Sequence, residues 1–267
     1  MTHLRSIGIK RGKVAGDRFP FTVPAIRSLE TLEFPSPVTF FAGENGSGKS
    51  TLLEGLAIAA RLPAIGAADL RTDDTLIPQR QLGDAFQLTW NRRAHRGFFL
   101  RAEDFFGFTK SLAKMRAEML AELDGVAESY ANRSAKAREL REGPLRASLA
   151  DMESRYGVDL DANSHGQSFL KLFRNRFVPG GLHLLDEPEA ALSPQSQLGL
   201  LAMMKEMIAE DAQFIVATHS PILLAFPGAT IYSFDEVPPR PVPYESLEHV
   251  VLTRDFLRDP ERFLRLL

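Results

Sequence analysis

Residues 43–51 read GENGSGKST, which fits the pattern G-x-x-x-x-G-K-[ST]. An apolar stretch predicted as a strand, VTFFA (38–42), precedes it, and TLLEGLAIAAR (51–61), which has helical spacing, follows it. Glycines in such a turn let successive backbone N–H groups approach an anion at the start of the helix. The stretch therefore predicts a phosphate-binding loop in a fold where strands and helices alternate.

The residue types of this loop suit a nucleotide that is bound together with a magnesium ion. We expect the Lys49 ammonium to reach the β- and γ-phosphates, and the Ser50 hydroxyl to bind Mg²⁺. Successive backbone N–H groups of the loop would face the phosphate oxygens. The predicted nucleotide-binding residues of the loop are Gly43, Glu44, Asn45, Gly46, Ser47, Gly48, Lys49, Ser50 and Thr51.

Two carboxylates follow a second apolar stretch, GLHLLDEPE (181–189). A carboxylate at the C-terminal end of a parallel strand lies beside the phosphate loop, so we predict that Asp186 holds Mg²⁺, directly or through water. Glu187 points elsewhere, one residue further along, and can act on the attacking water. The alternative is an acidic start of a helix before Pro188, where negative charge is favourable in its own right.

A third apolar stretch, FIVATHSP (214–221), ends in a histidine. If this strand belongs to the same parallel sheet, His219 lies at the same edge and could donate a hydrogen bond to a γ-phosphate. Taken alone, a histidine after a strand is more often structural. The neighbouring phosphate loop favours the functional interpretation.

The remaining pattern predicts an α/β fold. After residue 163, apolar strands alternate with helices, which is typical of a mostly parallel sheet flanked by helices. An antiparallel β part is expected at the N-terminus, where LRSIGIK (4–10) reads as a strand. The segments QLTW (87–90) and GFFLRA (97–102) read as a further hairpin or strand pair.

A helical insertion interrupts this alternation at about residues 110–160. It is rich in Ala, Leu, Glu, Lys and Arg, and we expect a break near Gly143-Pro144. Its charges are mixed in sign, which favours a solvated helical face over an arm that binds a partner. Residues 1–267 would form one domain that carries this insertion.

Composition excludes several classes of site. The 267 residues are 44% hydrophobic and 25% charged, with a net charge of −2, so bulk charge does not indicate a nucleic-acid partner. Without cysteine there can be no disulfide, cysteine nucleophile or cysteine-ligated metal, and the six histidines lack metal-site spacing. No signal sequence and no apolar run of about 18 residues is evident, so we expect a cytoplasmic protein that is not membrane-embedded.

Together, GENGSGKST, LLDEPEAALS and THS resemble the ATP-binding-cassette (ABC) type of ATPase. That family also carries a signature, commonly LSGGQ, which binds the γ-phosphate of ATP held by the other subunit. The stretch NSHGQ (163–167) stands in its place, with Asn163 and His165 departing from the pattern. The resemblance therefore implies a second set of nucleotide-binding residues, which consists of Ser164, His165, Gly166 and Gln167.

The resemblance implies a P-loop NTPase fold with an ABC-type head, and hydrolysis of ATP with Mg²⁺. Lys49, Glu187 and His219 would be catalytic, and Ser50 and Asp186 would hold the metal. Two copies would form an ATP-dependent homodimer, with low turnover for the chain alone. The residues of these motifs are similar to those of the non-transporter branch of the family. This branch includes stand-alone ATPases, overcoming-lysogenization-defect proteins, and chromosome-maintenance and DNA-repair ATPases.

One family feature has no clear counterpart in the sequence. Family members carry a glutamine at the end of a strand between the two motifs, where it lines Mg²⁺ and water. The best strand here, GFFLRAEDFF, offers Arg101 or Glu103 but no glutamine. Upstream lie Gln79, Gln81 and Gln87, and the sequence does not choose among them.

Three functions remain open at this level. The favoured one is an ATP-driven dimerisation switch in a DNA-related, defence or maintenance process, with a DNA or protein partner. The alternative is the nucleotide-binding subunit of an ABC transporter. A third is a nucleic-acid-binding module that uses the basic residues 92–96, flanked by Trp90 and Phe98, although a solvated basic loop explains them more simply.

Overall fold

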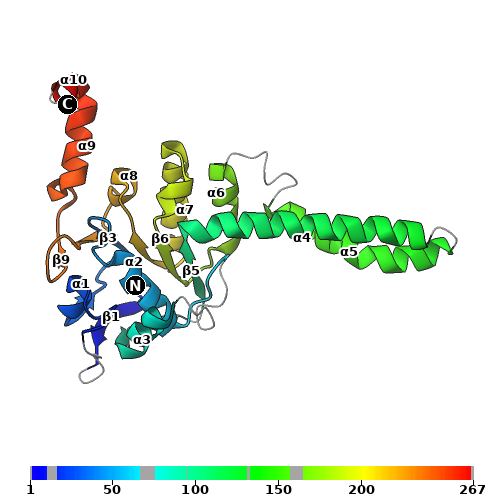
Figure 1. Ribbon diagram of the computed structural model, residues 1–267, viewed down its shortest axis with the longest axis horizontal. Coiled ribbons are helices and arrows are strands. Elements are labelled where there is room, and N and C mark those ends of the chain that lie inside the picture. Colours follow the sequence, from blue (N-terminus) through cyan, green and yellow to red (C-terminus); the bar gives the residue numbers. More distant parts are fainter. Residues whose placement is uncertain are drawn as a thin grey trace.

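A mostly parallel sheet forms the centre of the molecule (Figure 1). The computed structural model describes residues 2–10, 17–66, 76–94, 96–130, 133–156 and 165–265, with 106 and 165–168 described through their backbone only. Within these ranges six strands pair side by side, all parallel except the last pair. Their order is β5 (Gly97–Arg101), β6 (Leu182–Asp186), β7 (Gln213–Ala217), β3 (Val38–Ala42), β8 (Thr230–Ser233) and β9 (Arg240–Pro241).

The apolar runs of the sequence explain why these strands lie at the centre. Every residue of β3, β6 and β7 is buried, as expected for parallel strands covered on both faces. Alternate side chains enter two different cores: Phe41 and Leu184 pack on one face of the sheet, and Phe40 and Leu185 pack on the other. The predicted α/β class with a mostly parallel sheet is confirmed.

Helices cover this sheet, and two groups of helices project away from the body (Figure 1). The longer ones are α2 (Lys49–Ala60), α3 (Ile77–Ala85), α6 (His165–Arg176), α7 (Pro194–Ala209) and α9 (Glu248–Arg258). The short ones are α1 (Pro24–Arg27), α8 (Pro221–Leu224), α10 (Pro260–Leu264) and the 3₁₀ turns Pro188–Ala191 and Tyr244–Ser246. Helices α9 and α10 extend from the body at the C-terminal end of the chain.

A smaller antiparallel sheet forms the N-terminal part, as predicted. Its order is β2 (Thr31–Glu33), β1 (Leu4–Ile9) and β4 (Phe86–Trp90). The expected pairing of QLTW with GFFLRA is wrong, because β4 pairs with β1 whereas β5 pairs with β6 in the main sheet. Burial explains the separation: in β4 only Phe86 is buried, while the three central residues of β5 are all buried.

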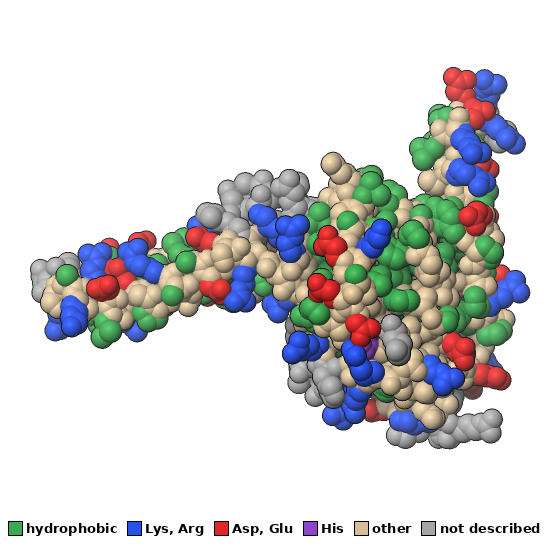
Figure 2. Space-filling view, turned by 180° about the vertical axis from the view of Figure 1, so that it is seen from behind, with side chains coloured by type: hydrophobic (Ala, Val, Ile, Leu, Met, Phe, Trp, Pro, Cys, Tyr) green, Lys and Arg blue, Asp and Glu red, His purple; other side chains and the backbone are tan. Residues whose placement is uncertain are grey.

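The helical insertion is an arm of two long helices, α4 (Ala102–Ser129) and α5 (Ala135–Tyr156), which pack together and extend from the body (Figure 1). The first helix begins at Ala102, directly after β5, and the second begins at Ala135. Arg116 of α4 forms an ion pair with Glu153 of α5, with 2.9 Å between Nη2 and Oε1. Basic, acidic and hydrophobic side chains are mixed along the arm in Figure 2.

The predicted helix break near Gly143-Pro144 is wrong, since Pro144 lies inside α5. A proline removes one backbone hydrogen bond from a helix, and other contacts must offset that loss. Glu142 accepts hydrogen bonds from Arg138 and Arg146, at 2.6 Å and 2.9 Å; the pair with Arg146 spans the proline, and the pair with Arg138 lies in the turn before it. Such pairs stabilise a helix by only a few tenths of a kcal/mol, so packing against α4 supplies the remainder.

Candidate nucleotide site

The GENGSGKST stretch forms the connection between β3 and α2. Gly48 adopts φ 102°, and a Cβ there would lie 2.6 Å from Cγ1 of Val23. Gly43 adopts φ 149°, and a Cβ there would lie 2.9 Å from Oδ1 of Asp235. Both positions require glycine on conformational and steric grounds. The strand, the tight loop and the helix therefore occur in the predicted order, with the start of α2 following the loop.

Lys49, the first residue of α2, is buried against the loop that precedes it. Its Nζ donates hydrogen bonds to the carbonyl oxygens of Gly43, at 2.7 Å, and Glu44, at 2.9 Å. Burial lowers the pKa of Lys49, and the negative charges of Glu187 and Asp186 oppose that shift. The ammonium is thus held inside the loop by carbonyl oxygens, a position from which it can reach an anion bound there.

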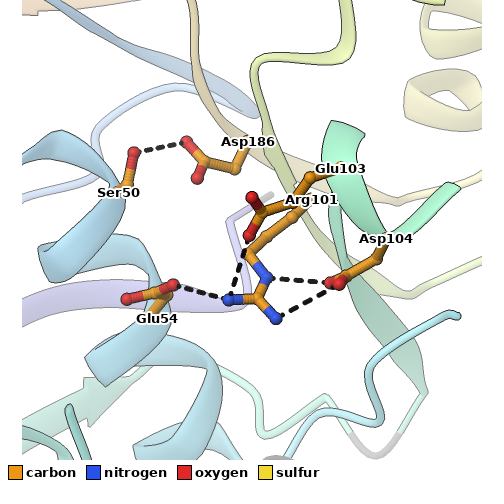
Figure 3. Close-up of polar contacts among 6 residues, drawn as sticks. All are labelled: Ser50, Glu54, Arg101, Glu103, Asp104 and Asp186. Carbon is orange, nitrogen blue, oxygen red and sulfur yellow. Dashed lines mark hydrogen bonds and ion pairs between the residues drawn. The ribbon is translucent and has the colours of Figure 1, made fainter. Parts of the chain in front are cut away.

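Ser50 and Asp186 meet at the edge of the main sheet (Figure 3). The Ser50 hydroxyl donates a hydrogen bond of 3.1 Å to Oδ1 of Asp186, which ends β6. Burial raises the pKa of Asp186 to about 7, with a smaller contribution from the neighbouring Glu54 and Glu187 charges. A hydroxyl and a carboxylate are hard oxygen donors that suit Mg²⁺. A cation would also offset the negative charge that burial makes costly, so the residues present fit the metal.

Glu187 and His219 lie at the same edge, on neighbouring strand ends. Glu187 adopts a left-handed φ of 49°, and its N–H donates to the carbonyl oxygen of Ala217 at 2.9 Å. Its Oε1 is 3.7 Å from Nε2 of His219, and the two side chains are 44% and 35% exposed. Burial lowers the pKa of His219, and Lys49 lowers it further. Left-handed backbone in a non-glycine residue is costly and clusters at functional sites.

Two further carboxylates hold the loops of this site, and the sequence analysis missed both. Oε1 of Glu189 accepts a hydrogen bond of 2.6 Å from the backbone N–H of His219, and burial raises the pKa of Glu189. Oδ1 of Asp235 accepts one of 2.6 Å from the backbone N–H of Glu44. Glu189 could have been noticed as the second glutamate of the DEPE motif, whereas nothing in the sequence around Asp235 indicates its role.

The structure describes the signature residues only in part. Ser164 lies outside the described residues, and His165, Gly166 and Gln167 form the start of α6 with their side chains undescribed. These three residues lie at the N-terminus of the helix, where backbone N–H groups can bind an anion. Their predicted contact with ATP of a second subunit stays a prediction.

The structure shows which residue stands beside Asp186 at the end of the next strand. In the pairing of β5 with β6, Arg101 is directly opposite Asp186. Of the glutamines considered, Gln87 lies on β4 in the antiparallel sheet, and Gln79 and Gln81 lie on α3. The strand end at which the family glutamine is expected is thus occupied by an arginine.

The basic segment 92–96 offers less to a nucleic acid than its sequence indicates. Phe98 is buried in the core and cannot stack on a base, and Arg92 forms an ion pair of 2.8 Å with Asp211. His95 lies outside the described residues. Across the described part of the chain, no helix is both long enough and apolar enough to cross a bilayer.

Two family models match parts of the chain. One is described as "AAA domain" and matches residues 23–60, which include the phosphate loop. The other is described as "AAA domain, putative AbiEii toxin, Type IV TA system" and matches residues 172–225, which include Asp186, Glu187 and His219. Both matches therefore coincide with the segments that build the site.

Curated relatives are similar over most of this chain but are much longer. The "Macrolide export ATP-binding/permease protein MacB" of Hahella chejuensis is 28% identical over 204 residues, which cover 76% of this chain and 29% of that protein. Its namesake from Escherichia coli K12 is 27% identical over 222 residues, 81% of this chain and 31% of that protein. The chain thus spans less than a third of the length of the curated relatives it matches.

Among solved structures, a nucleotide-free ATP-binding cassette from an ABC transporter aligns at 17% identity, with 98% of this chain and 97% of that chain covered and a TM-score of 0.47. The SMC head domain from Thermotoga maritima aligns at 15% identity, with 91% and 100% covered and a TM-score of 0.44. Both TM-scores lie below 0.5, so neither alignment carries an argument here. The two family matches and the relatives show that the chain is similar to AAA-type domains and to ATP-binding/permease proteins in the segments that build the site.

Proposed function

We propose that the chain is an ATP-driven dimerisation switch. The observation that carries this proposal is the convergence of Lys49, the Ser50–Asp186 pair and the Glu187–His219 pair at one sheet edge. These groups come from three strand ends, and each suits one part of phosphoryl transfer. In this proposal two copies enclose two ATP molecules, with each phosphate loop facing the start of α6 in the other copy.

The residues of one chain divide the chemistry among them. Lys49 binds the β- and γ-phosphates, and Ser50 and Asp186 would hold Mg²⁺, which neutralises phosphate charge when bound. Glu187 orients water for in-line attack on the γ-phosphate, and His219 donates a hydrogen bond to that phosphate. Because the chemistry is mostly positioning, a chain without its partner copy should hydrolyse ATP slowly. Release of phosphate would then reopen the dimer.

The alternative is the nucleotide-binding part of a transporter, which the name of the curated relatives, macrolide export ATP-binding/permease protein, supports. Against it stands Arg101 at the strand end where a glutamine is expected. A switch in a DNA-related, defence or maintenance process is supported by the resemblance of the motifs to those of the non-transporter branch. Exposed cations on α6, Lys171, Arg174 and Arg176, offer a surface for an anionic partner such as DNA.

The test is sedimentation of the Glu187→Gln variant with and without ATP, over a range of protein concentrations. Slow hydrolysis should trap the closed dimer, so we expect monomers without ATP and dimers with ATP and Mg²⁺. Glu206→Gln, an exposed change on α7, is the matched control. In the wild type, specific ATPase activity should rise with protein concentration. A monomeric Glu187→Gln variant that binds ATP fully would overturn the switch.

A further inference from the structure

Arg101 occupies a junction of three elements. It is the last residue of β5, it pairs in register with Asp186, and the arm helix α4 begins at the next residue. Its guanidinium does not contact Asp186 in Figure 3 but turns toward other carboxylates at the base of the arm. A fixed cation is thus built in beside the strand end that carries the predicted metal ligand.

The guanidinium is held in a defined orientation. Its Nε and Nη2 donate to Oδ2 and Oδ1 of Asp104, at 2.8 Å and 3.2 Å, which is a two-pronged contact of the kind that suits arginine. This leaves Nη1 for Oε1 of Glu54, at 3.1 Å (Figure 3). The Arg101, Asp104 and Glu54 side chains are 13%, 12% and 10% exposed, so solvent screens these contacts little. Glu103 approaches Nη1 at 3.4 Å but is 74% exposed.

Glu54 links this cluster to the nucleotide site. It lies four residues after Ser50 on α2, so both side chains project from the same side of that helix. Burial raises the pKa of Glu54, whereas the Arg101 charge opposes that shift. The Glu54 charge in turn contributes to the raised pKa of Asp186. Arg101 is therefore the group that compensates a second buried carboxylate close to the metal ligands.

We propose that Arg101 is a positioning residue of the nucleotide site: it holds Glu54 in an ion pair, so that the Glu54 charge does not add to that of Asp186 where phosphates and cation bind. This inference rests on the magnesium site proposed above. If the pair is broken by removal of Arg101, the site gains one net negative charge. The added negative charge then repels ATP that carries no cation, while the binding of ATP together with Mg²⁺ is affected less. If Glu54 is neutralised instead, the site gains one net positive charge and the effect reverses.

The experiment measures ATP affinity by fluorescence of a labelled nucleotide, once with Mg²⁺ and once with EDTA. Arg101→Met should weaken binding in EDTA about fivefold or more, a change of the size expected for one buried charge nearby. Glu54→Gln should strengthen it severalfold, and Arg101→Met with Glu54→Gln should return within about twofold of wild type. Arg116→Met, which removes the similar ion pair with Glu153 in the arm, is the matched control and should change neither affinity.

Opposite shifts that cancel are the signature of charge compensation, because a merely structural role weakens binding in all three variants. Equal weakening in the two single variants, or a double variant no better than Arg101→Met, would overturn the proposal. If Arg101→Met does not fold, Glu54→Gln and Arg101→Lys, which keeps the charge and should stay near wild type, decide the question. Wild-type binding that ignores Mg²⁺, with Asp186→Asn unchanged, would instead refute the proposed metal site.

Discussion

Oε1 of Glu187 lies 3.7 Å from Nε2 of His219, although the two residues belong to different strand ends. The gap is too long for a hydrogen bond and leaves both groups free to face a bound phosphate or water. We predict that Glu187→Gln lowers the ATPase kcat about 100-fold or more, because the amide cannot take a proton from the attacking water. ATP affinity should change less than about threefold. Single-turnover and binding measurements separate the two effects, and parallel losses in both would contradict the assigned role.

The role of Lys49 in binding ATP, before the chemical step, can be tested by substitution. Its ammonium is retained by two loop carbonyl oxygens at 2.7 Å and 2.9 Å, so it is already positioned for an anion in the loop. Lys49→Ala should weaken ATP binding about tenfold to 100-fold, since charge-assisted hydrogen bonds to phosphate are among the stronger contacts. Lys205→Ala, an exposed lysine on α7, should leave the affinity unchanged. Titration calorimetry provides the measurement, and equal affinities for the two variants would refute this contact.

Glu189 is expected to act through His219. Its carboxylate accepts the His219 backbone N–H at 2.6 Å and so fixes the loop that presents the imidazole. Glu189→Ala should lower kcat about tenfold with little change in KM, because the loop matters most when the γ-phosphate is transferred. Glu189→Gln retains a carbonyl oxygen as acceptor and should restore most of kcat. If both variants lose activity equally, the charge of Glu189 rather than this hydrogen bond is what matters.

The sequence was most informative where local pattern and global position agree. Three apolar runs became the fully buried strands β3, β6 and β7, and parallel strand ends then brought Ser50, Asp186 and His219 to one edge. Arg101 opposite Asp186 was beyond such reasoning, since the register of β5 on β6 is a long-range property. The prediction of a helix break at Pro144 was wrong for a related reason. The tendency of proline to end a helix was overridden by packing against α4 and by nearby ion pairs, which the short stretch of sequence around Pro144 does not reveal.

Two glycines provide a matched test of the fold around the site. Gly97 opens β5 with φ 123°, and a Cβ there would lie 1.8 Å from the carbonyl oxygen of Leu182. Gly143 lies inside α5, and a Cβ added there would have no neighbouring atom within 4 Å. Gly97→Ala should lower the free energy of unfolding by about 3 kcal/mol or more. Gly143→Ala should raise it by about 0.5–1 kcal/mol. Urea unfolding measures both, and similar values for the two would contradict the described backbone.

His183 should make the stability of the protein depend on pH. The ring is buried among Phe98, Phe177 and Phe214, and burial lowers the pKa of His183 from 6.5 to about 4. The unfolded chain therefore binds a proton between these two values that the folded chain does not. The associated stability is fully present above about pH 6.5 and is lost as the pH falls toward 4.

Between pH 7.5 and pH 5 this linkage should lower the free energy of unfolding by roughly 2 kcal/mol. His183→Leu keeps an apolar side chain in the same place and removes the titrating group. All other ionisable groups are common to both proteins, so the difference between their pH profiles isolates His183. Urea unfolding at both pH values is the measurement. If wild type and variant lose the same free energy between pH 7.5 and pH 5, the buried imidazole must already be able to take up a proton in the folded protein.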